Sequence, residues 1–176
     1  MSHVILHEYH AYHHSGNRTY AAIDWIVLHD MESANYLRAA ENCGTWFESA
    51  RSGGSTHYGC DDDSIQQYLS MLTVAWGAPG ANDNGVHIEQ MGMASWSKTK
   101  WLQHKGTLDN CAWLIAHIHG KVGVPIRRLT GAEIRAHKRG VVTHRQLTAA
   151  IGGTHTDPGP GYPMDWVMDR ARKYAT

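Results

Sequence analysis

The hydrophobic and polar positions of the chain form short apolar runs and longer segments with helical spacing. Residues 23–29 (Ile-Asp-Trp-Ile-Val-Leu-His) are β-branched, aromatic and apolar, which is typical of a buried strand. From Tyr36 to Ala50, apolar residues recur at every third or fourth position, which predicts a helix. Ser33 precedes this segment as a candidate N-cap, and Gly44 weakens its middle by roughly 1 kcal/mol.

Two further strand regions are predicted in the middle of the chain. Residues 55–60 (Ser-Thr-His-Tyr-Gly-Cys) precede the aspartates at 61–63, and residues 65–69 form the returning strand of a hairpin. The aspartates lack the spacing and the closing glutamate of a calcium loop, so we interpret them as a turn. Residues 78–85 have the composition of a loop, and residues 86–90 (Val-His-Ile-Glu-Gln) alternate as a short strand.

The second half of the chain predicts two amphipathic helices. An apolar stripe runs from Leu108 to Val122, with Thr107 as a candidate N-cap and Gly123 just after the end. Residues 140–144 (Gly-Val-Val-Thr-His) resemble a strand end or the entry to a loop. Residues 164–174 predict a closing helix after a rigid segment rich in proline and glycine.

Strands that alternate with helices predict an α/β fold, with a central mixed β-sheet flanked by helices. We find no repeat and no linker, and 176 residues fit one domain with one good core. Residues 1–22 are rich in histidine, but the spacing fits no single helical face and no thiol or carboxylate cluster completes a site. We therefore expect residues 1–22 to be a polar arm, packed on a domain formed by residues 23–176.

Composition and charge exclude several classes of partner. The 16 Lys and Arg residues balance 16 Asp and Glu residues, so no basic excess indicates nucleic acid or an anionic membrane. The first residues lack the pattern of a signal peptide, and no segment reaches the roughly 20 apolar residues of a membrane-spanning helix. The 3 cysteines lack zinc-finger spacing and are expected to be reduced thiols.

Three candidate metal ligands stand at the ends of predicted elements. His29 ends a strand, His144 follows Gly-Val-Val-Thr, and Asp157 opens Asp-Pro-Gly-Pro. Loops at the ends of a rigid sheet are where catalytic groups are usually displayed. Two imidazoles and one carboxylate, with a fourth position left to water, form the ligand set of a catalytic zinc ion. With 14 histidines in the chain, this pattern alone does not single out a site.

The sequence around these residues contains five blocks in a fixed order. They are Trp25-Ile-Val-Leu-His29, Ser55-Thr-His-Tyr58, Val86-His-Ile-Glu89, Thr143-His144 and His155-Thr-Asp-Pro-Gly-Pro160. In this order the blocks resemble type 2 N-acetylmuramoyl-L-alanine amidases, which include phage enzymes, bacterial recycling amidases and animal peptidoglycan recognition proteins. The resemblance runs from about Ile23 to Trp166, and the chain looks most like the amidase domain of actinobacteriophage endolysins.

This resemblance implies a zinc site and a catalytic carboxylate. It places the zinc ligands at His29, His144 and Asp157, and the general base of the recycling branch at Glu89. A carboxylate in that position can take a proton from water and deliver it to the leaving amine. Many members carry a lysine two residues before the third ligand, where it stabilises the oxyanion. Here that position is His155, whose imidazole can donate a hydrogen bond in the same role.

Other polar residues near the blocks receive structural interpretations. Some members carry a catalytic tyrosine in the second strand, but that position is Thr56 here, and we do not transfer the role to Tyr58. His57 and His87 are predicted to be structural histidines with satisfied hydrogen bonds. Asp30 is either an orienting partner of an imidazole or a solvated residue at a strand end.

The sequence thus predicts a zinc-dependent amidase that cleaves between the muramic acid lactyl group and L-alanine of peptidoglycan, as the catalytic domain of a phage endolysin. Two alternatives remain open: a non-catalytic peptidoglycan-binding module, and a zinc peptidase that cuts within the stem peptide. We expect a monomer without nucleic acid or membrane partners, made in the host bacterial cytoplasm without a signal peptide and acting on the cell wall. Core packing is expected for three tryptophans, with a glycan groove as the alternative: Trp76, Trp96 and Trp101.

Overall fold

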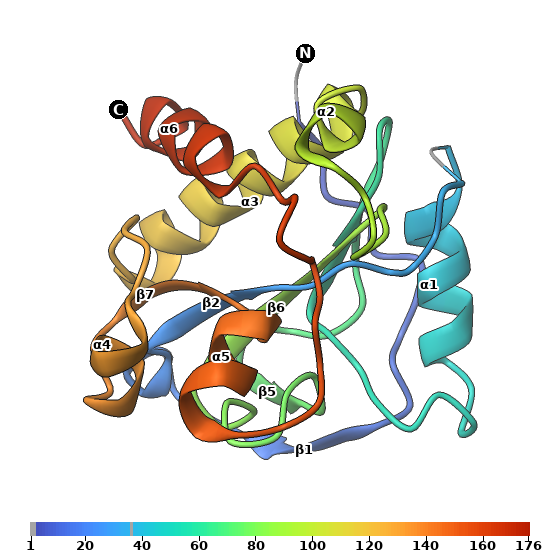
Figure 1. Ribbon diagram of the computed structural model, residues 1–176. Helices are drawn as coiled ribbons and strands as arrows, with labels where there is room; N and C mark the ends of the chain where they lie inside the picture. The colour runs from blue at the N-terminus through green and yellow to red at the C-terminus, as the bar shows by residue number, and fades with distance from the viewer. Residues whose placement is uncertain (1–2, 36) are drawn as a thin grey trace.

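The computed structural model describes residues 3–35 and 37–176, and its centre is a five-stranded mixed β-sheet (Figure 1). The order across the sheet is β4-β3-β6-β2-β7, in which β4 is antiparallel to β3 and the other neighbouring pairs are parallel. The predicted α/β fold with a central mixed sheet is confirmed. The strands of this sheet are β2 (Trp25–Leu28), β3 (Tyr58–Cys60), β4 (Ile65–Gln67), β6 (Gly85–Gln90) and β7 (Gly140–Thr143).

Helices cover both faces of the sheet (Figure 1). On one face α3 and α6 pack against each other and on the side chains of Ile26 and Leu28. On the other face α4 and α5 pack on Trp25 and Val27, while α1 lies beside β3 and β4. The helices are α1 (Ala39–Phe47), α2 (Lys98–Trp101), α3 (Lys105–Val122), α4 (Gly131–Arg135), α5 (His144–Ile151) and α6 (Met164–Tyr174), with the short 3-10 helix η1 (Tyr20–Ala22).

The residues before β2 are hydrogen-bonded to the rest of the protein. β1 (His14–Asn17) pairs antiparallel with β5 (Thr73–Ala75), and Leu6 forms an isolated bridge with Gln66. Neither β1 nor β5 is predicted from the sequence. β1 has four residues and no apolar side chain, and β5 has only three residues, so neither segment shows a recognisable strand periodicity. The guanidinium group of Arg18 donates to the carbonyl oxygens of Met71, Asn82, Asp83 and Gly85.

The helix predicted for residues 36–50 is observed as the shorter α1, and Tyr36 lies outside the described residues. Ser33 does not cap this helix but forms an isolated backbone bridge with a loop residue. Instead Asp61, in the turn after β3, accepts a hydrogen bond of 3.0 Å from the backbone N–H of Ala40. The first turn of α1 is therefore satisfied by a side chain from another element, which rules based on local sequence do not predict.

A second helix start is displaced for the same reason. Thr107 does not cap α3, which begins at Lys105. The backbone N–H and hydroxyl of Thr107 donate to Oδ1 of Asp62 at 2.9 and 2.8 Å. The end of α3 is as predicted, with Gly123 in the left-handed conformation at a φ of 69°. The aspartates of the β3–β4 turn therefore support the first turns of two helices.

Among the described helices, none combines the length and apolarity that crossing a membrane requires. Cys43, Cys60 and Cys111 are free thiols, and the last two are buried in the core.

Candidate functional site

The carboxyl ends of two neighbouring parallel strands bring two histidines together. His29 follows Leu28 at the end of β2, and His144 follows Thr143 at the end of β7. Leu28 and Thr143 are partners in the strand register, so the residues that follow them lie side by side. Thr143 also forms a capping box with Gln146, which starts α5 at His144 and fixes the direction of the chain there.

Asp157 reaches the same place from the loop between α5 and α6, drawn in orange to red in Figure 1. Its carbonyl oxygen accepts a hydrogen bond of 2.8 Å from the backbone N–H of Arg145. Gly159 has a positive φ of 82°, and a Cβ there would collide with the carbonyl oxygen of Ala94. Glycine at this position therefore allows the loop to pack closely against the residues that follow β6. This packing places Asp157 at the carboxyl-terminal edge of the sheet, beside His29 and His144.

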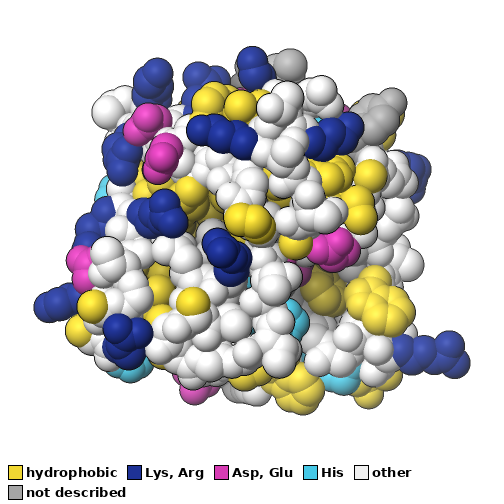
Figure 2. Space-filling model, viewed as in Figure 1, with side chains coloured by type: hydrophobic (Ala, Val, Ile, Leu, Met, Phe, Trp, Pro, Cys, Tyr) yellow, Lys and Arg dark blue, Asp and Glu magenta, His cyan; other side chains and the backbone are white. Residues whose placement is uncertain are grey.

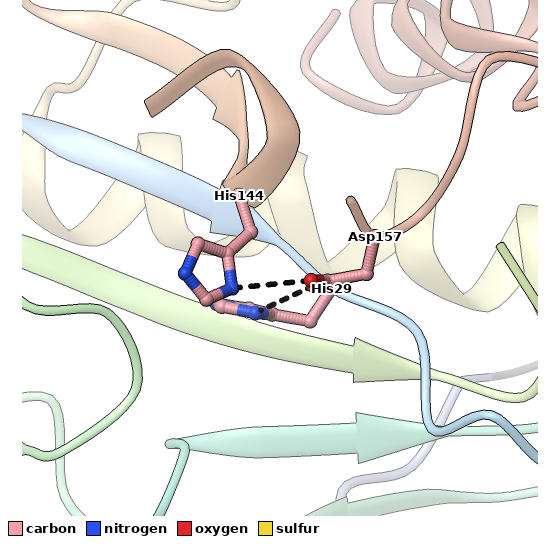
Figure 3. Close-up of side chains that lie close together, drawn as sticks. All are labelled: His29, His144 and Asp157. Atoms are coloured by element: carbon pink, nitrogen blue, oxygen red, sulfur yellow. Dashed lines mark hydrogen bonds and ion pairs between the residues drawn. The ribbon is translucent and has the colours of Figure 1, made fainter. Parts of the chain in front are cut away.

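His29, His144 and Asp157 point toward one another (Figure 3). Oδ2 of Asp157 lies 3.0 Å from Nδ1 of His29, and Oδ1 lies 3.3 Å from Nδ1 of His144. One possible ligand atom from each residue lies within 4.8 Å of the other two. Both histidines are buried. Across residues 3–35 and 37–176, no other three His, Cys, Asp or Glu side chains converge in this way.

The protonation states of these groups suit a metal ion. Burial acts to raise the pKa of Asp157, but hydrogen bonds with His144 and His29 outweigh it and hold that pKa well below its ordinary value. Burial lowers the pKa of His29, which favours the neutral ring. An ionised carboxylate and a neutral imidazole are the forms that bind metals, because each then offers a free lone pair.

A cavity of about 410 Å³ beside this group has a strongly acidic wall. Its lining includes four carboxylates and no Lys or Arg among the described residues. Oδ2 of Asp30 and Oε2 of Glu89 are buried without a hydrogen-bond partner, which is costly unless a positive charge compensates. Figure 2 shows acidic and histidine side chains in a hollow of this face, between the positions of α1 and α5. The titratable lining residues are His29, Asp30, Glu32, Glu89, His144, His155 and Asp157.

Glu89 lies on β6, next to the end of β2. The backbone N–H of His29 donates to the carbonyl oxygen of Ile88 at 2.9 Å, which sets the two strands in register beside Glu89. Burial, with the charges of Asp157 and Asp30, raises the pKa of Glu89 well above its ordinary value. Burial also raises the pKa of Asp30 to about 7. Carboxyl groups with raised pKa values inside a cavity are characteristic of catalytic sites.

His155 stands at the mouth of the cavity. Its side chain is 57% exposed, and its Nδ1 lies 3.5 Å from Oδ1 of Asp157. Its ring stacks on His144, with centroids 4.0 Å apart and planes 16° from parallel. The imidazole of His155 therefore lies beside the three converging residues, where it can donate a hydrogen bond to a molecule that enters the cavity.

The residues of this site lie within a segment that matches a known protein family. A model of the N-acetylmuramoyl-L-alanine amidase family (Amidase_2) matches residues 5–160. The chain belongs to this amidase family. The matched range includes His29, Glu89, His144 and Asp157. A search of curated protein sequences gave no match.

Solved structures of a hydrolase, an endolysin and an amidase share the fold. The Staphylococcus aureus hydrolase AmiA, solved with its ligand, has a TM-score of 0.75 and 18% identity, covering 99% of this chain and 85% of that one. A mutant endolysin from Bacillus subtilis has a TM-score of 0.65 and 18% identity, covering 99% and 100%. The amidase LysC from Clostridium intestinale has a TM-score of 0.60 and 13% identity, covering 97% and 99%. Identities this low show the amidase fold alone.

The amidase cavity continues into two neighbouring cavities that also include Glu89 in their lining. One, of about 490 Å³, includes Trp76 and His155, and the other, of about 380 Å³, includes Trp46 and Asp30. Trp76 is 43% exposed and Trp46 is 51% exposed. Trp46 is not among the residues predicted from the sequence, although its place off the apolar stripe of α1 is a signal for an exposed aromatic ring.

The tryptophans and other polar or aromatic residues considered in the sequence lie partly in the core and partly in the lining of these cavities. Trp101 is fully buried in the core, and Trp96 is partly buried against it, so core packing is confirmed for this pair. Trp76 instead lines a cavity. Tyr58 is buried, and its burial raises the pKa of its hydroxyl, so this side chain does not face the cavity of the amidase. Thr56 donates its hydroxyl hydrogen bond to the carbonyl oxygen of Tyr58 at 3.3 Å.

The two structural histidines differ from each other. Both nitrogens of His57 have partners: Nδ1 accepts from the backbone N–H of His87, and Nε2 lies 3.0 Å from the carbonyl oxygen of Thr73. His87 is less satisfied than predicted, since its Nε2 is buried without a partner. Its Nδ1 lies 3.0 Å from Nε2 of His29. The strand pattern contains a signal for this, because His87 and Glu89 are two apart and share a face of β6.

Proposed function

We propose that this chain is a zinc-dependent N-acetylmuramoyl-L-alanine amidase, which hydrolyses the amide bond between the muramic acid lactyl group and L-alanine of peptidoglycan. The observation that carries the proposal is the convergence of His29, His144 and Asp157 beside the unpartnered carboxylate of Glu89. Membership of the amidase family supports the reaction, and the chemistry of the donor set supports the metal.

The residues fit a zinc ion. Two imidazole nitrogens and one carboxylate oxygen are ligands that zinc favours, and three protein ligands leave a position open for catalysis. The surrounding cavity supplies further negative charge and two buried carboxylate oxygens that lack donors. We propose His29, His144 and Asp157 as the ligands. When bound there, zinc would polarise the amide carbonyl and lower the pKa of a neighbouring water.

Glu89 is proposed as the general base and then the general acid. Its carboxylate takes one proton from the attacking water, and the water oxygen bonds to the carbonyl carbon. Glu89 then gives this proton to the alanine nitrogen as the carbon–nitrogen bond breaks. The products are a free carboxyl on the lactyl group and a free amino terminus on the stem peptide. The raised pKa of Glu89 favours the return of the proton at neutral pH.

His155 is proposed to donate a hydrogen bond to the carbonyl oxygen as negative charge develops on it. Its exposed position at the cavity mouth, stacked on His144, supports this role. The three cavities that meet at Glu89 support a substrate that extends on both sides of the scissile amide. In this arrangement Trp76 and Trp46 contact the groups that flank the bond.

We also propose that the chain acts as a monomer on the bacterial cell wall, as the catalytic part of a phage endolysin. The presence of endolysins among the proteins of similar fold supports this setting. To test this setting, the purified protein is added to bacteria whose walls are accessible, and lysis is measured as a fall in the turbidity of the suspension. Unchanged turbidity, despite amidase activity on isolated walls, would contradict the proposal.

The proposed reaction is tested by digestion of purified cell walls, with products identified by mass spectrometry. We expect stem peptides with free amino-terminal L-alanine and glycan with intact lactyl groups. Chelation should abolish release, and zinc should restore it. Full activity of the metal-stripped protein excludes the zinc mechanism. Fragments cut inside the stem indicate a peptidase, and binding without release indicates a non-catalytic module.

A further inference from the structure

The candidate ligand His29 makes an unusual hydrogen bond on the side away from the proposed metal. Nδ1 of His29 faces Asp157 at 3.0 Å, and Nε2 of His29 lies 3.0 Å from Nδ1 of His87. Both rings are buried. A histidine that binds a metal generally donates its second N–H to a carboxylate, a carbonyl or water. Here the partner is a second imidazole.

We propose that His87 is a positioning residue that fixes the tautomer of His29. When Nδ1 of His29 binds the metal, the one proton of this neutral imidazole lies on Nε2, and Nδ1 of His87, 3.0 Å away, is its acceptor. Nδ1 of His29 then presents its lone pair toward Asp157 and His144. The inference rests on the proposed zinc site, and it assigns to His87 the orientation and the proton position of one ligand.

The surroundings of His87 are shaped around its ring. The ring stacks on His57, with centroids 5.7 Å apart and planes 8° from parallel. A Cβ at Gly77 would lie 2.6 Å from Cγ of His87, and a Cβ at Gly85 would lie 2.9 Å from its Nε2. Side chains larger than hydrogen at positions 77 and 85 would therefore push the ring out of reach of His29. The absence of a side chain at Gly77 and Gly85 therefore leaves the ring of His87 room for the orientation that reaches His29.

The hydrogen bonds of His57 show that the ring stacked behind His87 is neutral. Because the backbone N–H of His87 donates to Nδ1 of His57 at 3.0 Å, this nitrogen carries no proton. The proton of His57 then lies on Nε2 and is donated to the carbonyl oxygen of Thr73 at 3.0 Å. Burial and the positive charge of Arg18 lower the pKa of His57 to about 3. The neutral ring of His57 therefore adds no positive charge of its own behind His87.

A purely structural role does not account for His87. Its Nε2 is buried and has no hydrogen-bond partner within the described part of the chain. An unsatisfied buried nitrogen costs stability, and an apolar side chain of similar size would avoid that cost. Among the described residues, the hydrogen bond to His29 is the one interaction that requires a histidine at position 87 and offsets the cost of the unsatisfied nitrogen.

Two substitutions separate the hydrogen bond from the shape of the ring. His87→Phe keeps an aromatic ring but offers no acceptor, whereas His87→Asn keeps an acceptor oxygen near the position of Nδ1. Competition with a chromophoric chelator measures zinc affinity. We expect affinity to fall about 10–100-fold in His87→Phe and by less than about threefold in His87→Asn. The cobalt-loaded His87→Phe protein should also show a shifted visible absorption spectrum.

His57→Asn is the matched control. It alters the same stacked layer, and its amide oxygen can still accept from the backbone N–H of His87. We expect a lower Tm with zinc affinity unchanged. An equal loss of affinity in His57→Asn and His87→Phe would overturn the proposal, because affinity would then follow general stability.

The proton position can also be observed without a substitution. In zinc-loaded wild type, ¹⁵N NMR of the histidine rings should show His29 protonated at Nε2, and protonation at Nδ1 would overturn the inference. This measurement decides the matter if His87→Phe does not fold. Wild type that binds no zinc overturns the zinc site and the inference together. Wild type and His87→Phe binding zinc equally overturns the inference alone.

Discussion

Nη2 of Arg18 lies 3.0 Å from Nε2 of His57, so the segment before β2 reaches the layer of histidines behind the candidate site. Since Nε2 of His57 carries a proton, this contact is a close approach of two donors rather than a hydrogen bond. Arg18 is held there by its carbonyl acceptors, which include Gly85 at the start of β6 at 2.9 Å. The position of β6, and with it Glu89, thus depends on an arginine from the N-terminal segment.

Replacing Arg18 with alanine should destabilise the whole protein. The substitution removes the donors to four carbonyl oxygens, two of which lie in the loop before β6. We expect the free energy of unfolding to fall by about 3 kcal/mol, because several partly buried carbonyl oxygens lose their donors at once. Denaturant titration measures the change. Arg51→Ala, at an exposed position, should change stability by less than about 0.5 kcal/mol. Similar values for the two variants would contradict the structural role of Arg18.

Replacing Glu89 with glutamine should separate proton transfer from metal binding. The amide has nearly the same shape but accepts no proton, so we expect kcat on cell walls to fall about 10²–10⁴-fold. Zinc affinity should persist, because Glu89 is not a proposed ligand. Stability should hold or rise, since an unpartnered buried carboxylate becomes neutral. Glu8→Gln, at an exposed site, is the control. Equal product yields from wild type and Glu89→Gln would remove Glu89 from the mechanism.

Several parts of the fold can be predicted from the sequence because their physical cause is local. The apolar run that ends at His29 is long enough to predict a buried strand, and it places His29 at the carboxyl end of that strand. The stripe from Leu108 to Val122, closed by Gly123, marks α3 for the same reason. The choice of His144 and Asp157 among many polar residues comes from the ordered blocks shared with the amidase family, and the structure brings both beside His29. Their role as ligands stays a prediction.

The remaining features depend on contacts between distant segments. The first turns of α1 and α3 are satisfied by Asp61 and Asp62, from a turn that neither helix adjoins. The contact of His87 with His29 joins strands far apart in the chain. Local propensity carries no information on such pairs, because they depend on how the strands are aligned in the sheet. A shift of one residue in that register would exchange the buried and exposed faces of a strand.

The two exposed tryptophans should affect substrate binding. Trp76 and Trp46 line separate cavities that meet at Glu89, so each should contact a different part of an extended substrate. For Trp76→Ala and for Trp46→Ala we expect KM on soluble wall fragments to rise about tenfold, the equivalent of about 1.4 kcal/mol of lost contact. Tyr12→Ala removes an aromatic ring that is 61% exposed and lines neither cavity, and KM should not change. A change confined to kcat would contradict a binding role.

A pH-dependent contribution to stability is expected at Glu133, where α4 begins. Hydrogen bonds from the backbone of Thr130 and from Arg127 lower the pKa of Glu133 from 4.5 to about 2. A depressed carboxyl pKa stabilises the fold fully above the unfolded value of 4.5, and the effect is lost as pH falls through about 2. Glu133→Gln should therefore have a slightly lower Tm than wild type at neutral pH. The two Tm values should converge near pH 2. A difference that is constant with pH would contradict the ionised carboxylate of Glu133 as its source.

Zinc should stabilise the metal-stripped protein through the same residues that define the site. A cation among the carboxylates of the cavity binds the folded state only, so zinc at about 100 times Kd adds about 2.7 kcal/mol. For a domain of this size, that corresponds to a rise in Tm of about 5–10 °C. Asp157→Ala removes the carboxylate whose Oδ2 faces His29 and whose Oδ1 faces His144, and it should abolish the rise. Asp63→Ala, in an exposed part of the β3–β4 turn, should retain it. A rise of equal size in Asp157→Ala would mean that zinc binds away from His29 and His144, whose Nδ1 atoms face the two oxygens of Asp157.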